Sequence, residues 1–159
     1  MPDRANALTG AAGEHYVAYR LSRMGYLVGL TRGGSPSVDL MVGHWENGRA
    51  VSIQVKTSES AHRYRKRDNK EWWSWRVGKQ VASLRGDSIF YAFVSLEGDE
   101  GNPICLTFIV PSEIVAARVE TDGPDAYWFS TEDYARGTND KKQWLEDWSS
   151  ITQMVAGDK

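Results

Sequence analysis

Three polar residues interrupt two apolar stretches within residues 37–58, SVDLMVGHWENGRAVSIQVKTS. Asp39 stands inside the first stretch, and Gln54 and Lys56 flank Val55 in the second. Side chains alternate between the two faces of a strand, so Gln54 and Lys56 share one face. If the two stretches form neighbouring strands, a carboxylate, an amide and an amine converge on that face. A buried carboxylate is costly unless it is paired or bound to a metal, which makes this cluster a candidate site.

A glutamate joins the cluster from the helix predicted over residues 7–24. Glu14 shares the spacing of one helix face with Gly10, Val17, Ala18 and Leu21. A glutamate within the stripe that faces a sheet needs a partner. Two partners remain open at this point: Lys56, in an ion pair, or a metal ion shared with Asp39.

Two carboxylates, an amide oxygen and a lysine suit phosphodiester hydrolysis. Hard divalent cations such as Mg²⁺ or Mn²⁺ take oxygen ligands, and the candidates are Glu14, Asp39, Gln54 and the backbone carbonyl of Val55. Such a metal lowers the pKa of a bound water and polarises a phosphoryl oxygen. Lys56 would orient the water or stabilise the charge that develops on phosphorus. Taken singly, each residue also has a structural interpretation, such as a plain Glu14–Lys56 ion pair or a lysine whose ammonium reaches solvent.

A basic and aromatic segment, AHRYRKRDNKEWWSWRVGKQ at residues 61–80, follows the Lys56 strand closely. Cations bind phosphates, and aromatic faces stack on exposed bases. We therefore predict DNA contacts from Arg63, Arg65, Lys66, Arg67, Lys70, Arg76, Lys79 and Gln80, the last near the scissile phosphate. For Trp72, Trp73 and Trp75 the favoured interpretation is different, namely that they anchor the segment to the core.

The order of these residues resembles the PD-(D/E)XK nuclease superfamily. A helix glutamate at Glu14, a strand aspartate at Asp39 and the IQVKT motif with Gln54-x-Lys56 are most similar to its Mrr-like and Holliday-junction-resolvase-like branches, over roughly residues 10–96. The resemblance implies a restriction-endonuclease-like fold, with a central mixed sheet flanked by helices in an αβββαβ core. It also implies Mg²⁺-dependent DNA cleavage. Asp39 would be the first metal ligand, Lys56 the catalytic lysine and Glu14 the helix glutamate. A homodimer is implied as well, because two DNA strands require two sites.

The sequence departs from the superfamily pattern at two positions. Val38 rather than proline precedes Asp39, and Gln54 replaces the usual second acidic residue. The resemblance includes branches with Gln-x-Lys, so the glutamine is compatible with activity. It removes one negative charge from the metal site, which makes Glu14 more important.

The elements that must position these residues follow from hydrophobic periodicity and turn signals. Helices are predicted at 7–24, 77–85, 111–118 and 141–148. Strands are predicted at 26–30, 38–42, 50–57, 88–96, 104–110 and 127–130. Residues 31–37 are predicted as a loop, and residues 58–76 as a long loop or a poorly formed hairpin. This order indicates a mixed α/β class. A single nuclease-like domain over residues 1–159 is expected, with a core at about 7–110 and a C-terminal elaboration at 111–159.

Composition limits the function classes. With 159 residues, 41% hydrophobic and 25% charged, the chain suits one soluble domain. No apolar run reaches the length of a membrane span, and the N-terminus lacks a secretory apolar region, so a cytoplasmic location is expected. One cysteine excludes an internal disulfide. Residues 1–96 hold 14 Lys and Arg against 8 Asp and Glu, whereas residues 97–159 hold 5 against 13. This asymmetry favours a basic working face on the N-terminal part.

Other candidate residues carry weaker signals. His15, His44 and His62 lack the spacing of metal ligands, and Cys105 lies in an apolar strand as a core residue. The glycine-rich RGGSP at 32–36 lacks the lysine and the length of a phosphate loop. Three function classes remain open: a metal-dependent endonuclease, a nuclease-fold module that binds nucleic acid or a protein without cutting, and an interaction protein that docks through its acidic C-terminal part.

Overall fold

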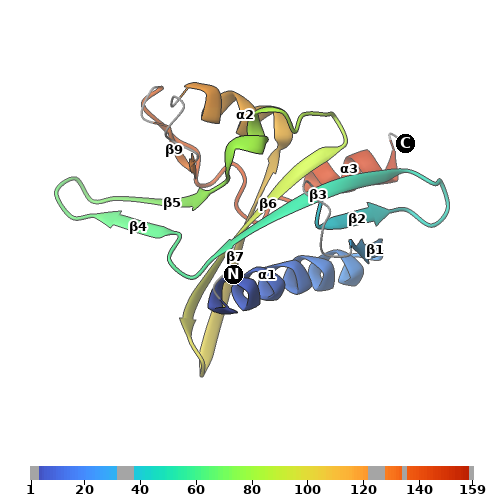
Figure 1. The fold of residues 1–159 in the computed structure, drawn as a ribbon, viewed down its shortest axis with the longest axis horizontal. Helices are drawn as coiled ribbons and strands as arrows, with labels where there is room; N and C mark the ends of the chain where they lie inside the picture. Colours follow the sequence, from blue (N-terminus) through green and yellow to red (C-terminus); the bar gives the residue numbers. More distant parts are fainter. Residues whose placement is uncertain (1–3, 32–37, 122–127, 134–135, 158–159) are drawn as a thin grey trace.

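A five-stranded mixed sheet forms the centre of the computed structural model, which describes residues 4–31, 38–121, 128–133 and 136–157 (Figure 1). The strand order is β1-β2-β3-β6-β7. β3 and β6 run parallel, and the other neighbouring pairs are antiparallel. The strands are β1 (Leu27–Leu30), β2 (Leu40–Gly43), β3 (Ala50–Ser58), β6 (Ile89–Asp99) and β7 (Asn102–Pro111).

One face of this sheet is covered by two helices that are far apart in the sequence. α1 (Arg4–Arg23) packs against β1 and β3 through the buried Val17 and Leu21, and α3 (Ser149–Ala156) contributes Ile151 and Val155 to the same cluster. The cluster also contains the alternating residues Val51, Ile53 and Val55 of β3. The even-numbered residues of β3, including Gln54 and Lys56, therefore face the opposite side of the sheet.

The opposite face carries an aromatic core. Tyr91, Phe93 and Phe108 of the central sheet pack with Trp73, Trp75 and Phe129. The last three come from a smaller sheet of β4 (His62–Arg65), β5 (Lys70–Arg76) and β8 (Trp128–Ser130), in which Trp75 pairs with Phe129. Figure 1 shows the β4–β5 hairpin extending well beyond the central sheet. α2 (Ser112–Thr121) and the 3-10 turn η1 (Lys79–Ala82) lie against each other beside this core.

Two sequence predictions between β3 and β6 need correction. Of the two alternatives for residues 58–76, a long loop or a poorly formed hairpin, the structure has the hairpin, and it is a regular antiparallel one because Trp73 and Trp75 share one strand face and bury it. The helix predicted at 77–85 is reduced to η1, since Gly78 takes a φ of 86° and starts only a short 3-10 turn. The crossover to the parallel strand β6 therefore consists of a hairpin and one turn. The predicted αβββαβ order of the core is not confirmed.

The helix predicted at 141–148 was also wrong. This segment runs through turns, Glu146 has a φ of 53°, and α3 begins only at Ser149. Trp144 and Trp148 do not form one helix face. Trp144 packs in the aromatic core and Trp148 packs in the other cluster, so tertiary burial on two sides overrides the helical spacing. Two short strands, β9 (Glu132–Asp133) and β10 (Thr138–Asn139), precede this segment.

The remaining predicted elements match the structure to within a few residues. The helix at 7–24 corresponds to α1, and the helix at 111–118 to α2. The glycine-rich RGGSP at 32–36 and Tyr127, the first residue of the strand predicted at 127–130, lie outside the described residues. Cys105 lies in β7 and is partly buried, at the margin of the core rather than inside it. No described helix is long and apolar enough to cross a membrane.

Candidate active site

Asp39 lies where the ladder between β2 and β3 stops. Its backbone N–H still bonds the carbonyl of Ile53, at 2.9 Å. The next β3 group that faces this edge is the N–H of Val55, and it donates to Oδ2 of Asp39 at 2.7 Å. The carboxylate therefore replaces a missing strand partner, which satisfies a backbone donor that would otherwise be unpaired. This contact fixes the carboxylate at the open edge of β3.

Gln54 completes the hold on Asp39. Its Nε2 donates to the same Oδ2 at 2.5 Å, and its side chain is almost fully buried. The other carboxylate oxygen, Oδ1, accepts no hydrogen bond from the described residues. Within one strand residue, N–H and C=O point to the same side, so the carbonyl of Val55 faces this edge as well. Two oxygens are thus left for a ligand at one place.

Lys56 lies on the same sheet face, two residues beyond Gln54. Burial lowers the pKa of its ammonium below the ordinary value, and the charge of Asp39 acts in the opposite direction. Burial raises the pKa of the Asp39 carboxyl, against the effects of the Val55 hydrogen bond, the Lys56 charge and the Gln54 hydrogen bond. Lys56 forms no hydrogen bond or ion pair with the described residues. Its ammonium is therefore close to Asp39 but available to another anion.

Glu14 approaches Asp39 from the sheet face that α1 covers, opposite the face of Gln54 and Lys56, because α1 packs very closely on β3. The contact is between Gly13 and Thr57: a Cβ placed on Gly13 would lie 1.9 Å from the Oγ1 of Thr57. Only glycine allows this approach. Burial raises the pKa of the neighbouring Glu14, and the negative charge of Asp39 raises it further, while His15 lowers it. The ion pair with Lys56 that the sequence left open is not formed in the structure; Glu14 instead feels the charge of Asp39.

The donor set fits a hard divalent cation that keeps several waters. Glu14 and Asp39 are mutually repelling carboxylates whose pKa values both lie above the ordinary range, and a cation between them would relieve this repulsion. The described residues contain no group of three or more His, Cys, Asp and Glu able to hold a metal. The protein would therefore supply few ligands, which is the usual situation for Mg²⁺.

Tyr91 is a residue of this face that sequence reasoning missed. It is the register partner of Gln54 on the parallel strand β6, and it is buried. Burial, followed by the charge of Asp39, raises its pKa to about 12. The signal was present in the strand SIFYAFVSL, where Tyr91 is the one phenol among mostly apolar residues. Its meaning depended on which strand would pair with β3.

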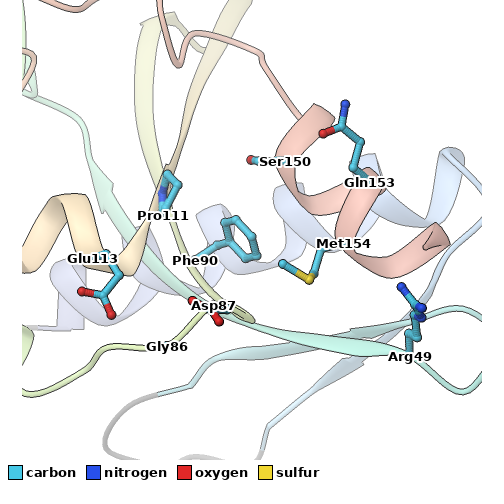
Figure 2. Close-up of a pocket in the computed structure, with 9 residues that line it drawn as sticks. All are labelled: Arg49, Gly86, Asp87, Phe90, Pro111, Glu113, Ser150, Gln153 and Met154. Atoms are coloured by element: carbon cyan, nitrogen blue, oxygen red, sulfur yellow. The ribbon is translucent and has the colours of Figure 1, made fainter. Parts of the chain in front are cut away.

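Two hollows lie beside the central sheet. One of about 540 Å³ lies between α1 and the end of β3, lined by Thr9, Gly10 and Thr57 among others, directly beyond Lys56. The other, of about 500 Å³, lies between the start of β6 and α3, and Phe90, Arg49 and Met154 are among the residues that line it (Figure 2). None of the four candidate site residues, Glu14, Asp39, Gln54 and Lys56, lines either hollow.

The predicted DNA-contacting cations fall into two groups. Arg63 donates to the carbonyls of Ser60 and His62, Arg65 makes two hydrogen bonds of 2.8 Å to Asp68, and Lys70 pairs with Glu132 at 3.3 Å. These three brace the hairpin. Lys66, Arg67 and Arg76 are exposed and form no ion pair with the described residues. Lys79 and Gln80 are exposed on η1, and no hydrogen bond joins Gln80 to the carboxylates of the site.

The tryptophans of this segment follow the structural interpretation. Trp73 and Trp75 are buried in the aromatic core, with ring centroids 5.3 Å and 5.4 Å from that of Phe108. The partly buried Trp72 lies under the guanidinium of Arg65, 5.3 Å from the ring centroid. The hairpin is therefore anchored to the core through Trp73 and Trp75, while the exposed Lys66 and Arg67 lie in its turn.

Acidic residues of the C-terminal part are paired inside the protein. The buried Glu132 contacts Lys70 and Arg65 of the hairpin, and Asp140 pairs with the buried Arg118. Glu146 pairs with Arg20 of α1 at 2.6 Å and accepts the Thr107 N–H. Glu132 and Glu146 thus hold the C-terminal segment against the hairpin and α1.

The fold is similar to that of the solved structure of a bacterial homing endonuclease, I-Ssp6803I. The match has a TM-score of 0.57 and 16% sequence identity, and it covers 98% of this chain and 96% of that one. No protein-family model matches the sequence, and a search of curated proteins finds no match either. The similarity extends over the whole chain, so it includes the C-terminal elaboration. Membership of the PD-(D/E)XK branch stays a prediction from the sequence.

Proposed function

We propose that this protein is a metal-dependent DNA endonuclease that hydrolyses phosphodiester bonds at the Glu14, Asp39, Gln54 and Lys56 cluster. One observation carries the proposal. The Asp39 carboxylate is fixed through one oxygen by Gln54 and Val55, and it keeps its other oxygen free beside the unpaired ammonium of Lys56. A plain structural aspartate would not need an unpaired lysine in a half-buried position. The shared fold with a homing endonuclease supports the same reaction class.

Mg²⁺ or Mn²⁺ bound to Asp39, Glu14 and the Val55 carbonyl would lower the pKa of a nearby water and offset the phosphate charge. In the hydrolysis, the water oxygen forms a bond to phosphorus, the bond from phosphorus to the leaving sugar oxygen breaks, and that oxygen takes up a proton. Lys56 donates to a non-bridging phosphate oxygen, where negative charge grows in the transition state. Gln54 holds Asp39 in place and leaves its amide oxygen as a further ligand or water acceptor.

The remaining interactions with DNA come from the hairpin. Lys66, Arg67 and Arg76 are the cations free to bind backbone phosphates, while Arg63, Arg65 and Lys70 keep the hairpin in shape. Phosphate contacts position the DNA without reading its sequence. Double-strand cleavage would require a second site, which a second copy of the chain would supply.

A second candidate function is a nuclease-fold module that binds DNA without cutting it. The observation in its favour is that Gln54 directs its NH₂ group toward Asp39. A glutamate at this position would instead offer a second carboxylate to the metal. With Gln54, the site holds one negative charge fewer than a pair of strand carboxylates would provide. In this case Asp39 and Gln54 would act only to close the edge of β3.

A cleavage assay separates the two candidates. Wild type, Lys56→Ala and Asp39→Asn are incubated with linear, supercoiled and branched DNA in Mg²⁺, in Mn²⁺ and in a chelator. Lys142→Ala, an exposed lysine far from the cluster in sequence, serves as the charge-matched control. We expect wild type and the control to cleave only when Mg²⁺ or Mn²⁺ is present and not in the chelator. The two site variants should not cleave under any condition. Binding without cleavage by any protein would support the module instead.

A further inference from the structure

A row of three polar side chains crosses the sheet at the site. Asp39 precedes β2, Gln54 lies opposite it on β3, and Tyr91 is the parallel register partner of Gln54 on β6. Register partners project from the same sheet face. The phenol of Tyr91 therefore belongs to the same wall as the Asp39 carboxylate and the Lys56 ammonium. The influence of the Asp39 charge on the Tyr91 hydroxyl is consistent with this placement.

The ring of Tyr91 is held rigidly. It stacks on Phe93 with centroids 5.6 Å apart and an interplanar angle of 12°, and the residue is only 1% exposed. Phe93 in turn stacks on Phe129 at 4.3 Å. A ring fixed by such a stack places its hydroxyl at one position, with little entropy left to lose when a ligand binds.

The hydroxyl itself has no partner. It forms no hydrogen bond with the described residues, although a buried tyrosine normally finds one. It is not among the unpartnered side-chain atoms that are sealed from solvent, so the hydroxyl keeps a small accessible area although the residue as a whole is buried. A phenol is protonated at neutral pH and donates through its O–H. Phenylalanine would fill an aromatic core position without this unpaired group, so packing alone does not account for tyrosine here.

We infer that Tyr91 is a further residue of the active site, whose hydroxyl donates a hydrogen bond to a non-bridging oxygen of the phosphodiester held beside Asp39 and Lys56. This inference rests on the proposed nuclease function and adds a neutral donor to it. Lys56 supplies the charge, while the phenol supplies a donor of fixed direction from the adjacent strand. The two would bind the phosphate from different sides of Gln54.

The test removes only the hydroxyl. Tyr91→Phe is compared with Tyr26→Phe, which alters a partly buried tyrosine that packs against the opposite core cluster. We expect Tyr91→Phe to keep the thermal stability and the DNA affinity of wild type and to lower the single-turnover cleavage rate about 10- to 100-fold, as for removal of a hydrogen bond to a charged group. The control should cleave like wild type. Equal rates for both variants would overturn the inference.

A second measurement does not depend on cleavage. Wild-type protein labelled with ¹³Cζ-tyrosine is titrated with duplex DNA in Ca²⁺, and the Tyr91 signal is assigned by its absence from Tyr91→Phe. A shift of this signal on DNA addition, with the Tyr26 signal unchanged, supports the hydrogen bond even if wild type proves unable to cleave. An unshifted Tyr91 signal in a complex that is fully formed would overturn it. Failure of the cleavage proposal and failure of the Tyr91 inference are therefore distinguishable.

Discussion

Gln54 Nε2 and Asp39 Oδ2 lie 2.5 Å apart, so the glutamine at the motif position donates to the strand aspartate. Together with the Val55 N–H at 2.7 Å, it fixes one oxygen of the carboxylate and leaves the other oxygen for a ligand. Gln54 therefore orients the aspartate whether or not it also binds a metal. Its replacement by a carboxylate would change both the charge and the direction of this interaction.

Gln54→Glu tests that role. Without metal, the new carboxylate lies against Asp39, cannot donate the hydrogen bond and repels a like charge, so the variant should unfold at a lower temperature than wild type. With Mn²⁺ present, the added charge should keep or raise metal affinity and restore the stability. Calorimetric Mn²⁺ titration and thermal unfolding with and without metal measure both effects. Gln80→Glu, on the exposed turn η1, is the matched control and should show neither. A metal-free stability equal to wild type would contradict the hydrogen bond.

Asp39→Asn and Lys56→Ala should separate metal binding from chemistry. Asp39→Asn removes the only strand carboxylate of the cluster, so both Mn²⁺ binding and cleavage should be abolished. Lys56→Ala should leave Mn²⁺ binding largely intact and slow single-turnover cleavage, since the lysine acts on charge that develops in the transition state. If Asp39→Asn cuts DNA like wild type, the reaction takes place elsewhere or belongs to a contaminant.

Glu14 predicts a pH dependence of stability with a definite sign. Burial and the charge of Asp39 raise its pKa in the folded state above the unfolded value of 4.5. Below pH 4.5 the Glu14 carboxyl is protonated in both the folded and the unfolded state, so it does not lower the free energy of unfolding. As pH rises through the folded pKa, the charged form penalises the native state. Glu14→Gln should therefore match wild type at a pH of about 4 and melt a few degrees higher at neutral pH without metal, the gain being limited by solvent screening. A variant less stable than wild type at neutral pH would contradict the placement of Glu14.

Gly13→Ala should destabilise the protein by about 1–3 kcal/mol, because its methyl group would overlap Thr57. The matched control is Gly10→Ala, one turn earlier, where nothing lies within 4 Å and a helix-favouring residue should stabilise by about 0.5–1 kcal/mol. Thr57→Ala in the Gly13→Ala background should recover only part of the stability, since the Thr57 Cβ would still be 2.9 Å away. Denaturant unfolding measures all three, and equal effects of the two glycine variants would exclude the close approach of α1.

Neutralising Lys66, Arg67 and Arg76 together should weaken DNA binding about equally for all sequences. The slope of log affinity against log salt should become shallower by ~0.9 for each duplex phosphate that the variant no longer neutralises. Arg65→Ala is a different experiment, since it also removes the ion pairs with Asp68 and Glu132 that brace the hairpin. Fluorescence anisotropy at several salt concentrations measures the slopes, with Lys142→Ala beside them. An unchanged slope in the triple variant would show that the hairpin is ordinary solvated surface.

The sequence determined those features that depend on local pattern. Alternating apolar residues on two neighbouring strands predicted that Asp39, Gln54 and Lys56 share one sheet face, and helical spacing placed Glu14 within the helix stripe that faces the sheet, because side-chain periodicity is fixed by backbone geometry. The mixed sheet, α1 and the β6–β7 pair followed from the same patterns and from short connections. The predicted burial of Trp73 and Trp75 is also confirmed, because the two residues lie on the same face of β5.

Only the tertiary structure decided which local preferences survived and which distant residues met. The spacing of Trp144 and Trp148 favoured a helix, but their burial in two different cores imposed turns instead. The pairing of Gln54 with Tyr91 depended on the parallel alignment of β3 with β6 across a hairpin and a turn, which no local pattern specifies.

The cations of the hairpin show the same limit. Arg65 and Lys70 look like free cations in the sequence, and the fold gives both of them Glu132, a residue far along the chain, as a buried partner. Long-range pairing is chosen by the total burial and charge compensation of the whole chain. For that reason the sequence did not show that Tyr91 lies beside Gln54, which depends on the alignment of β3 with β6.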